Sequence, residues 1–334
     1  MKIKKLEEIQ NADIQELEGY FEKVVVIPTE TVYGLAARID NEEALRNIFK
    51  VKGRPSDNPL IVHVSSVDML KSIISDEEIL PDYLKLMEAF WPGPLSLLFK
   101  SKESISKTVR GNSMDTIVVR MPKNAILRGM IDKIGVPLAA PSANKSGRPS
   151  PTTLDHVIDD LGPEVEVYID GGECESGLES TIFGISDCKP VIFRPGNVTK
   201  EQIEGVLGYK VDVRSNNDSN NEFVCPGQKY KHYSPVHPVY LFLRNNLHEN
   251  MQKIRNQNPS AKIGILQHGA IDYKISCEYS YDLGNSKSEC ARNIFAGLRF
   301  LDKRSDIIFV VGFEIQEEGL AIMDRLSKAA SFIL

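Results

Sequence analysis

Residues 50–64 read KVKGRPSDNPLIVHV, a basic bend that runs directly into an apolar segment. The β-branched residues of 60–64 predict a short buried strand. Lys50, Lys52 and Arg54 precede this strand, with a glycine and a proline that fix the bend. An ammonium and a planar guanidinium held together suit phosphate or carboxylate groups. The stretch therefore predicts an anion site at the mouth of a strand, although a run of cations is more commonly a solvated face.

Strand-like and helix-like segments alternate on both sides of this stretch, across residues 1–207. Short β-branched runs predict strands, and periodic apolar residues that end at Pro or Gly predict helices. The expected strands are 24–30, 60–64, 95–99, 116–122, 136–141, 167–172 and 180–186, and the expected helices are 41–52, 79–91, 125–135 and 151–162. This pattern is typical of an α/β or α+β domain.

A polar segment and a second α/β pattern follow. Residues 213–238 open with a Ser/Asn/Asp run that has no hydrophobic period, which indicates a flexible linker. Apolar runs at 239–243, 262–268 and 306–313 alternate with helical segments and predict a small parallel α/β sandwich. The expected boundaries are 1–207 for the first domain, 208–237 for the linker and 238–334 for the second domain.

Composition excludes several classes of protein. The 334 residues carry a formal charge of −6 with 42% hydrophobic and 26% charged residues, so anion binding must come from local clusters. Five scattered cysteines without a CxxC pair argue against a disulfide framework or a zinc ribbon and favour a reduced compartment. The charged first segment lacks the apolar core of a signal peptide, and no run is long enough to span a membrane. We expect a cytoplasmic protein without membrane contact.

The segment PTETVYGLAA (28–37) leaves Thr29, Glu30 and Thr31 at the end of a predicted strand. Strand ends that open into polar turns are where α/β proteins place ligands. The alternative is a capped turn with Tyr33 packed inward. His63, in the strand at 60–64, taken alone is more commonly a satisfied core histidine than a ligand.

A third polar segment is APSANKSGRPSPTT (140–153), where hydroxyls and a glycine precede a predicted helix. Backbone N–H groups in such a loop can cradle phosphate, and the alternative is a helix cap with nothing bound. Arg120, Ser180 and Arg194 lie at further strand ends. Together these segments predict a sheet edge suited to a triphosphate and a small polar substrate. His232 and His237 lack the ligand spacing of a metal site.

These motifs resemble those of the YrdC-like family. The resemblance rests on PTETVYGL, the K-x-R of 52–54 followed by PSDNPLIVHV, WPGPLSLLF, VVRMP, and the S-x-N of 142–144. The linker GQKYKHYSP (227–235) and the second domain are similar to the two-domain form of the family. The resemblance implies a twisted-sheet α/β catalytic domain, a smaller Rossmann-like α/β C-terminal domain, and a linker that folds over the active site.

The resemblance also implies an activity and a set of site residues. Members make L-threonylcarbamoyl-AMP and pyrophosphate from L-threonine, bicarbonate or CO2, and ATP with Mg²⁺ held by its phosphates. Other proteins transfer the threonylcarbamoyl group to tRNA next to the anticodon. The implied ATP-binding residues are Lys52, Arg54, Asn58, Ser142, Asn144, Ser150, Arg194 and Tyr230, with Lys52 and Arg54 also catalytic; the implied threonine-binding residues are Thr31, His63, Arg120, Ala140 and Ser180.

Two other functions remain open at this point. The basic cleft could hold tRNA or double-stranded RNA without catalysis, which would make binding fall steeply with salt. A YrdC-like enzyme could instead use carbamoyl phosphate, but such proteins carry zinc-finger and acylphosphatase segments for which this chain has neither room nor cysteines. We expect the synthase, as a monomer, with weak tRNA binding at most.

Overall fold

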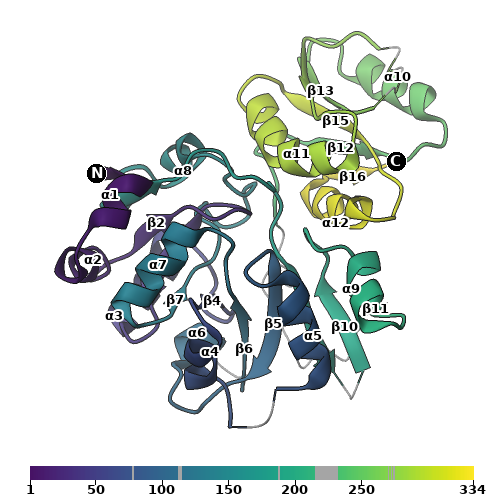
Figure 1. Ribbon diagram of the computed structural model, residues 1–334. Helices are drawn as coiled ribbons and strands as arrows, with labels where there is room; N and C mark the ends of the chain where they lie inside the picture. Colours follow the sequence, from purple (N-terminus) through teal and green to yellow (C-terminus); the bar gives the residue numbers. More distant parts are fainter. Residues whose placement is uncertain are drawn as a thin grey trace. The chain divides into compact units, whose positions relative to one another are not determined.

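The computed structural model describes residues 1–76, 79–111, 115–186, 189–214, 232–269, 271, 273 and 275–334. The chain divides into two compact units (Figure 1). The first unit comprises Met1–Ser146, Pro151–Glu175 and Glu179–Lys229, and the second comprises Gly147–Ser150, Ser176–Leu178 and Tyr230–Leu334. The division at 207 and 238 stays a prediction, and two short segments from the range predicted as the first domain group with the second unit.

The first unit is built on one mixed sheet, in which eleven strands are described. Its order is β1 (Lys2–Lys5), β8 (Val167–Asp170), β2 (Val25–Ile27), β3 (Gly34–Arg38), β7 (Leu138–Ala139), β4 (Ile61–His63), β6 (Thr116–Arg120), β5 (Leu95–Lys100), β9 (Thr181–Ser186), β10 (Lys189–Arg194) and β11 (Asp212–Val213). Among the central strands, β4–β6 and β5–β9 pair in parallel, whereas β4–β7 and β5–β6 pair antiparallel.

Helices join these strands. They are α1 (Leu6–Asn11), α2 (Ile14–Tyr20), α3 (Glu42–Lys52), α4 (Val67–Ile73), α5 (Pro81–Phe90), α6 (Lys107–Arg110), α7 (Ala125–Ile134), α8 (Leu154–Leu161), the 3-10 turn η1 (Gly162–Glu164) and α9 (Lys200–Leu207). The helix expected at 41–52 is α3, and the strand expected at 60–64 is β4. The segment after Tyr33 was expected only as a turn, and it continues as β3, paired antiparallel to β2.

Helix α3 ends where the basic bend begins, and its ends explain why. The Asn41 side chain accepts the Ala44 N–H at 3.0 Å, which caps the first turn. Gly53 adopts the left-handed conformation with φ 62°, which stops the helix and turns the chain. Lys52 therefore belongs to the last turn of the helix, and Arg54 starts the loop that leads to β4.

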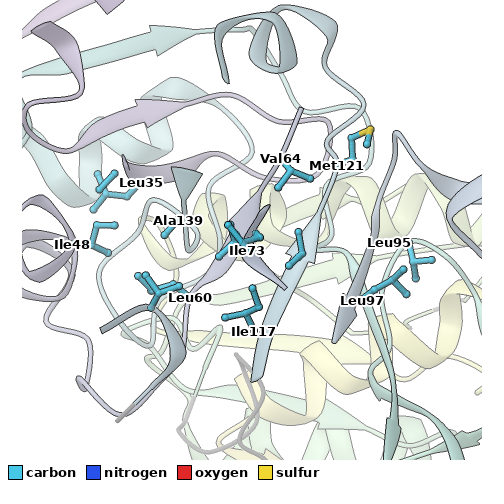
Figure 2. Close-up of a cluster of buried hydrophobic side chains, with 14 of the residues drawn as sticks. Leu35, Ile48, Leu60, Val64, Ile73, Leu95, Leu97, Ile117, Met121 and Ala139 are labelled. Atoms are coloured by element: carbon cyan, nitrogen blue, oxygen red, sulfur yellow. The ribbon is translucent and has the colours of Figure 1, made fainter. Parts of the chain in front are cut away.

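Both faces of the sheet are covered. In β2 and β3, Val26 and Leu35 face the larger core with helix α3, while Val25 and Ala36 face a second core with α1, α2 and α7. The larger core continues under β4, β5 and β6, as Figure 2 shows for Leu60, Ile117 and their neighbours. Such burial on both faces accounts for the continuous apolar runs in the sequence.

The second unit is a parallel sheet with helices, as predicted. The sheet order is β14 (Tyr279–Asp282), β13 (Ile263–Gln267), β15 (Ile307–Val311), β12 (Val239–Phe242) and β16 (Phe332–Ile333), and its four strand pairings are parallel. The helices are α10 (Leu247–Gln257), α11 (Lys287–Asp302) and α12 (Glu318–Ala329). No helix in the described ranges is long and apolar enough to cross a membrane.

Candidate active site

A row of polar side chains crosses the central strands of the first unit. Register pairs His63 of β4 with Arg120 of β6, and Arg120 with Ser96 of β5. Two residues away along each strand, the same face carries Ile61, Val118 and Leu98, which belong to a small apolar core. Since residues two apart share a face, the polar row continues this buried face towards the strand ends. The row therefore forms a polar surface, called the polar floor below, at the edge of this small apolar core.

Arg120 is the centre of this floor and is only 4% exposed. Its Nε donates to the Gly93 carbonyl at 3.1 Å, and its Nη1 donates to the Thr31 hydroxyl at 2.8 Å. Its Nη2 lies 2.5 Å from Oε1 of Glu30, an ion pair whose angles do not meet those of a hydrogen bond. The guanidinium is thus fixed in its plane by two neutral acceptors and balanced in charge by one carboxylate.

The turn after β2 places the Thr31 hydroxyl beside the Arg120 guanidinium. The Thr29 hydroxyl accepts the N–H groups of Thr31 at 3.1 Å and Val32 at 3.2 Å, and it donates to the Val32 carbonyl at 2.7 Å. The two threonine hydroxyls lie 2.8 Å apart. Either hydroxyl can donate in the contact between them, and Thr31 Oγ1 accepts from Arg120 Nη1. The sequence motif therefore encodes a side-chain-capped turn that orients one hydroxyl.

A second buried group lies at the start of β9. Ser96 and Ser180 hydroxyls are 2.7 Å apart, and Arg194 donates from Nη2 to the Ser180 carbonyl at 2.8 Å and to its hydroxyl at 3.1 Å. A Cβ on Gly196 would lie 2.4 Å from the Glu179 carbonyl oxygen, so only glycine permits this close approach of the chain. Arg194 and Ser180, predicted for different substrates, are thus hydrogen-bonded to each other.

His63 is a buried imidazole without a hydrogen-bond partner on Nδ1 among the described residues. Burial, followed by the positive charge of Arg120, lowers its pKa from 6.5 to about 3. The ring is therefore neutral across the physiological range. A neutral imidazole beside a guanidinium can accept or donate one hydrogen bond to a ligand without adding charge.

The loop after β7 approaches both the turn and the basic bend. The Ala140 N–H donates to the Ile61 carbonyl at 2.9 Å, and the Ala143 N–H donates to the Tyr33 carbonyl at 2.8 Å. Ser142 donates through Oγ to Oδ1 of Asn144 at 2.5 Å. These bonds bring the S-x-N segment against the strand that carries His63 and the turn that carries Thr31. The first unit thus gathers the predicted residues of 140–144 with those of both substrate sets.

Lys52 and Arg54, which were predicted to bind phosphate together, have different hydrogen-bond partners in the structure. Lys52 is 2% exposed, and its Nζ donates to the carbonyls of Ser142 and Asn144, each at 2.5 Å. Arg54 donates from Nε to the Asn58 carbonyl at 3.2 Å and from Nη2 to the Pro59 carbonyl at 2.8 Å. The expectation of two cations on an open bend is thus modified: Lys52 joins the end of helix α3 to the loop after β7, and Arg54 holds the segment that enters β4.

Asn58 is the predicted ATP residue with the most unusual environment. It is 1% exposed, and both its Nδ2 and its Oδ1 lack hydrogen-bond partners among the described residues. Buried amide groups without partners are costly, since each loses its bonds to water. An amide with one free donor group and one free acceptor is suited to a ligand that offers both.

Two of the predicted ATP-binding residues, Ser150 and Tyr230, are not among the residues that the first unit brings together. Ser150 lies in Gly147–Ser150, which clusters with the second unit. Tyr230 lies outside the described residues. Tyr233, the other linker tyrosine, is buried in the second unit with φ 63°, and its ring stacks on Phe295 at 5.3 Å between ring centres.

The site also contains residues that were not singled out from the sequence as binding residues. Glu30, Thr29 and Ser96 are buried and contact predicted residues directly. Thr29 and Glu30 lie in the recognised turn, so their position was a usable signal. Ser96 sits inside an apolar strand, where one serine gives no signal before the register of β5 and β6 is known. Within the described ranges, no group of three or more His, Cys, Asp or Glu side chains is placed to hold a metal ion.

The fold and the site define an α/β protein whose central strands end in buried arginines, a neutral imidazole and, nearby in the chain, an amide without a hydrogen-bond partner among the described residues. This set of side chains suits a small anionic ligand. Residues 21–196 match the family model Sua5/YciO/YrdC, described as Telomere recombination. Residues 198–331 match the model described as Threonylcarbamoyl-AMP synthase, C-terminal domain. The chain belongs to the threonylcarbamoyl-AMP synthase family, in its two-domain form.

Similar proteins cover nearly the whole chain. The threonylcarbamoyl-AMP synthase of Pyrococcus abyssi is 38% identical, with 93% of this chain and 91% of that protein covered. The synthase of Bacillus subtilis is also 38% identical, with 92% and 89% covered. The crystal structure of P. abyssi Sua5 complexed with L-threonine matches with a TM-score of 0.89 at 35% identity, covering 100% of this chain and 99% of that one.

Proposed function

We propose that this chain synthesises L-threonylcarbamoyl-AMP from L-threonine, bicarbonate or CO2, and ATP. The threonine nitrogen bonds to the carbon of CO2, and loss of a proton leaves a carbamate. A carbamate oxygen then bonds to the α-phosphorus of ATP, and the bond from that phosphorus to the bridging oxygen breaks, which releases pyrophosphate. Both reactants are anions, so the site must supply positive charge and fixed donors.

The observation that carries the proposal is the Arg120–Thr31 hydrogen bond at 2.8 Å on the sheet face that also carries His63. A guanidinium is the side chain best matched to an amino-acid carboxylate, and a hydroxyl with a neutral imidazole suits the rest of a small polar amino acid. P. abyssi Sua5, which has the same fold, was solved with L-threonine. We assign the threonine to Thr31, His63, Arg120, the Ala140 backbone and Ser180.

We assign ATP to the residues that the resemblance to the family implies. The residues are Lys52, Arg54, Asn58, Ser142, Asn144, Ser150, Arg194 and Tyr230, of which Tyr230 lies outside the described part of the chain. These side chains are nitrogen and hydroxyl donors, a set that fits phosphate oxygens and not a hard cation. We therefore propose that the ATP phosphates, and not protein side chains, would hold Mg²⁺, which would neutralise part of their charge.

The test is pyrophosphate release from ATP with Mg²⁺, measured with and without L-threonine and with and without bicarbonate. We expect release only when both are present, and slower release when L-serine replaces threonine. Release that does not depend on threonine would contradict the proposal. Carbamoyl phosphate in place of L-threonine and bicarbonate, with ATP kept as the source of pyrophosphate, and a salt titration with tRNA, test the two other functions. We propose that the product passes to the proteins that transfer the group to tRNA in the cytoplasm.

A further inference from the structure

Glu30 is a buried carboxylate that the proposed chemistry does not yet use. Its side chain is 3% exposed and directly follows Thr29 in the turn after β2. Neither carboxylate oxygen has a hydrogen-bond partner among the described residues. A buried carboxylate usually collects several hydrogen bonds, because water no longer solvates it. Its ion-pair partner in the structure is Arg120, with Oε1 2.5 Å from Nη2.

The pair is balanced in charge but is not saturated in hydrogen bonds. Arg120 directs Nε to Gly93 and Nη1 to Thr31, whereas Nη2 has no hydrogen-bond partner among the described residues. An ion pair built only to support a core gains most from two parallel N–H···O bonds. Nη2 carries two N–H groups, and the single carboxylate oxygen beside it can engage only one of them, so that nitrogen keeps the capacity to donate to a carboxylate ligand.

We propose that Glu30 is a positioning residue for the amino-acid substrate. It holds the Nη2 edge of Arg120 in place and neutralises the guanidinium before the substrate arrives, so that the substrate carboxylate meets a preorganised donor. Glu30 acts through Arg120 and does not touch the substrate. This inference rests on the assignment of L-threonine to Arg120.

Glu30→Gln keeps the shape of the side chain and removes its charge. We expect the KM for L-threonine to rise at least 10-fold while the KM for ATP stays within twofold, because the bonds that the described residues make to this pair come from Gly93 and Thr31, which are not assigned to ATP. Glu30→Asp keeps the charge and should restore part of the loss. Asp40→Asn is the matched control, since Asp40 pairs with Arg38 in the same unit through an exposed bidentate contact.

A double-mutant cycle separates positioning from general support of the fold. In an Arg120→Lys background, Glu30→Gln should raise the threonine KM by less than twofold, because the group through which it acts is gone. Wild-type protein without threonine-dependent pyrophosphate release would overturn the proposed function itself. Normal wild-type release with an unchanged threonine KM in Glu30→Gln, or a parallel rise of both KM values, would overturn only the role of Glu30. If Glu30→Gln does not fold, an unchanged threonine KM in Glu30→Asp overturns that role, and a raised threonine KM with an unchanged ATP KM supports it.

Discussion

The three cations at the end of α3 occupy three different environments. Lys50 is exposed, Lys52 is buried against two carbonyls, and Arg54 is half-buried against the entrance of β4. Sequence spacing places them together but does not reveal which of them reaches the interior. Burial separates Lys52, which joins the end of α3 to the loop after β7, from the solvated Lys50, although the two lysines are only two residues apart.

Lys52→Met should reduce both stability and activity. It removes two charge-assisted hydrogen bonds to the Ser142 and Asn144 carbonyls, a loss of about 2–4 kcal/mol of unfolding free energy. Because those carbonyls belong to the loop assigned to ATP, we also expect pyrophosphate release to fall at least 100-fold. Lys50→Met, at the exposed position, should change unfolding free energy by less than about 0.5 kcal/mol. Urea unfolding and steady-state release measure the two effects, and equal behaviour of the two variants would contradict the assignment.

His63 should make stability depend on pH. The folded protein holds its pKa near 3 through burial and Arg120, against 6.5 ordinarily, so the unfolded chain binds the proton first as the pH falls. The free energy of unfolding should then decrease between pH 6.5 and about 3, by up to about 1.4 kcal/mol per pH unit. His63→Gln should flatten this slope, measured as urea midpoints at pH 7.5 and 4.5. If the unfolding free energy of His63→Gln depends on pH as steeply as that of the wild type, His63 is not the cause of the slope. His248→Gln, at an exposed position, is the control and should keep the wild-type slope.

At the scale of elements, local signals predicted α3 well because both of its ends are encoded nearby. Asn41 caps one end and Gly53 the other, so the predicted 41–52 differs from the observed Glu42–Lys52 by one residue. Strand β3 was missed because its small residues, Gly34–Arg38, resemble a turn and are held by pairing with β2. The row of His63, Arg120 and Ser96 depends on register between distant strands, which no local pattern encodes.

Gly53→Ala tests how the end of α3 aims the basic bend. A Cβ there meets no atom within 4 Å, so the cost arises only from the left-handed φ of 62°, about 1–2 kcal/mol. Gly129→Ala, inside α7 with equally open space, should instead stabilise by about 0.5–1 kcal/mol. Gly53→Asn should recover part of the loss, since asparagine tolerates this conformation. Thermal unfolding of the three variants measures these differences in stability. If Gly53→Ala is as stable as the wild type, the bend does not need glycine.

At the scale of the whole molecule, the two units are interleaved in the chain. Segment Gly147–Ser150 clusters with the second unit, where Ser234 N–H donates to the Gly147 carbonyl at 2.7 Å. Arg299 of α11 donates to the Pro149 carbonyl at 2.5 Å, and Arg148 pairs with Asp302 at 3.2 Å. The segment that carries Ser150, a residue assigned to ATP, is therefore held by a side chain 150 positions later in the sequence. A prediction that treats domains as consecutive stretches of sequence does not reveal this contact.

Arg299→Leu should separate the two substrates in kinetics. Arg299 is 4% exposed, and loss of its bond to Pro149 removes one of the contacts that hold the segment carrying Ser150, while the threonine-binding residues of the first unit keep their contacts. We expect the KM for ATP to rise at least fivefold and the KM for L-threonine to stay within twofold, measured by pyrophosphate release. Arg304→Leu, at an exposed position shortly after α11, should leave both values unchanged. If Arg299→Leu also leaves the ATP KM unchanged, Ser150 does not contact ATP; if it raises both values together, Arg299 supports the fold in general and not the nucleotide segment.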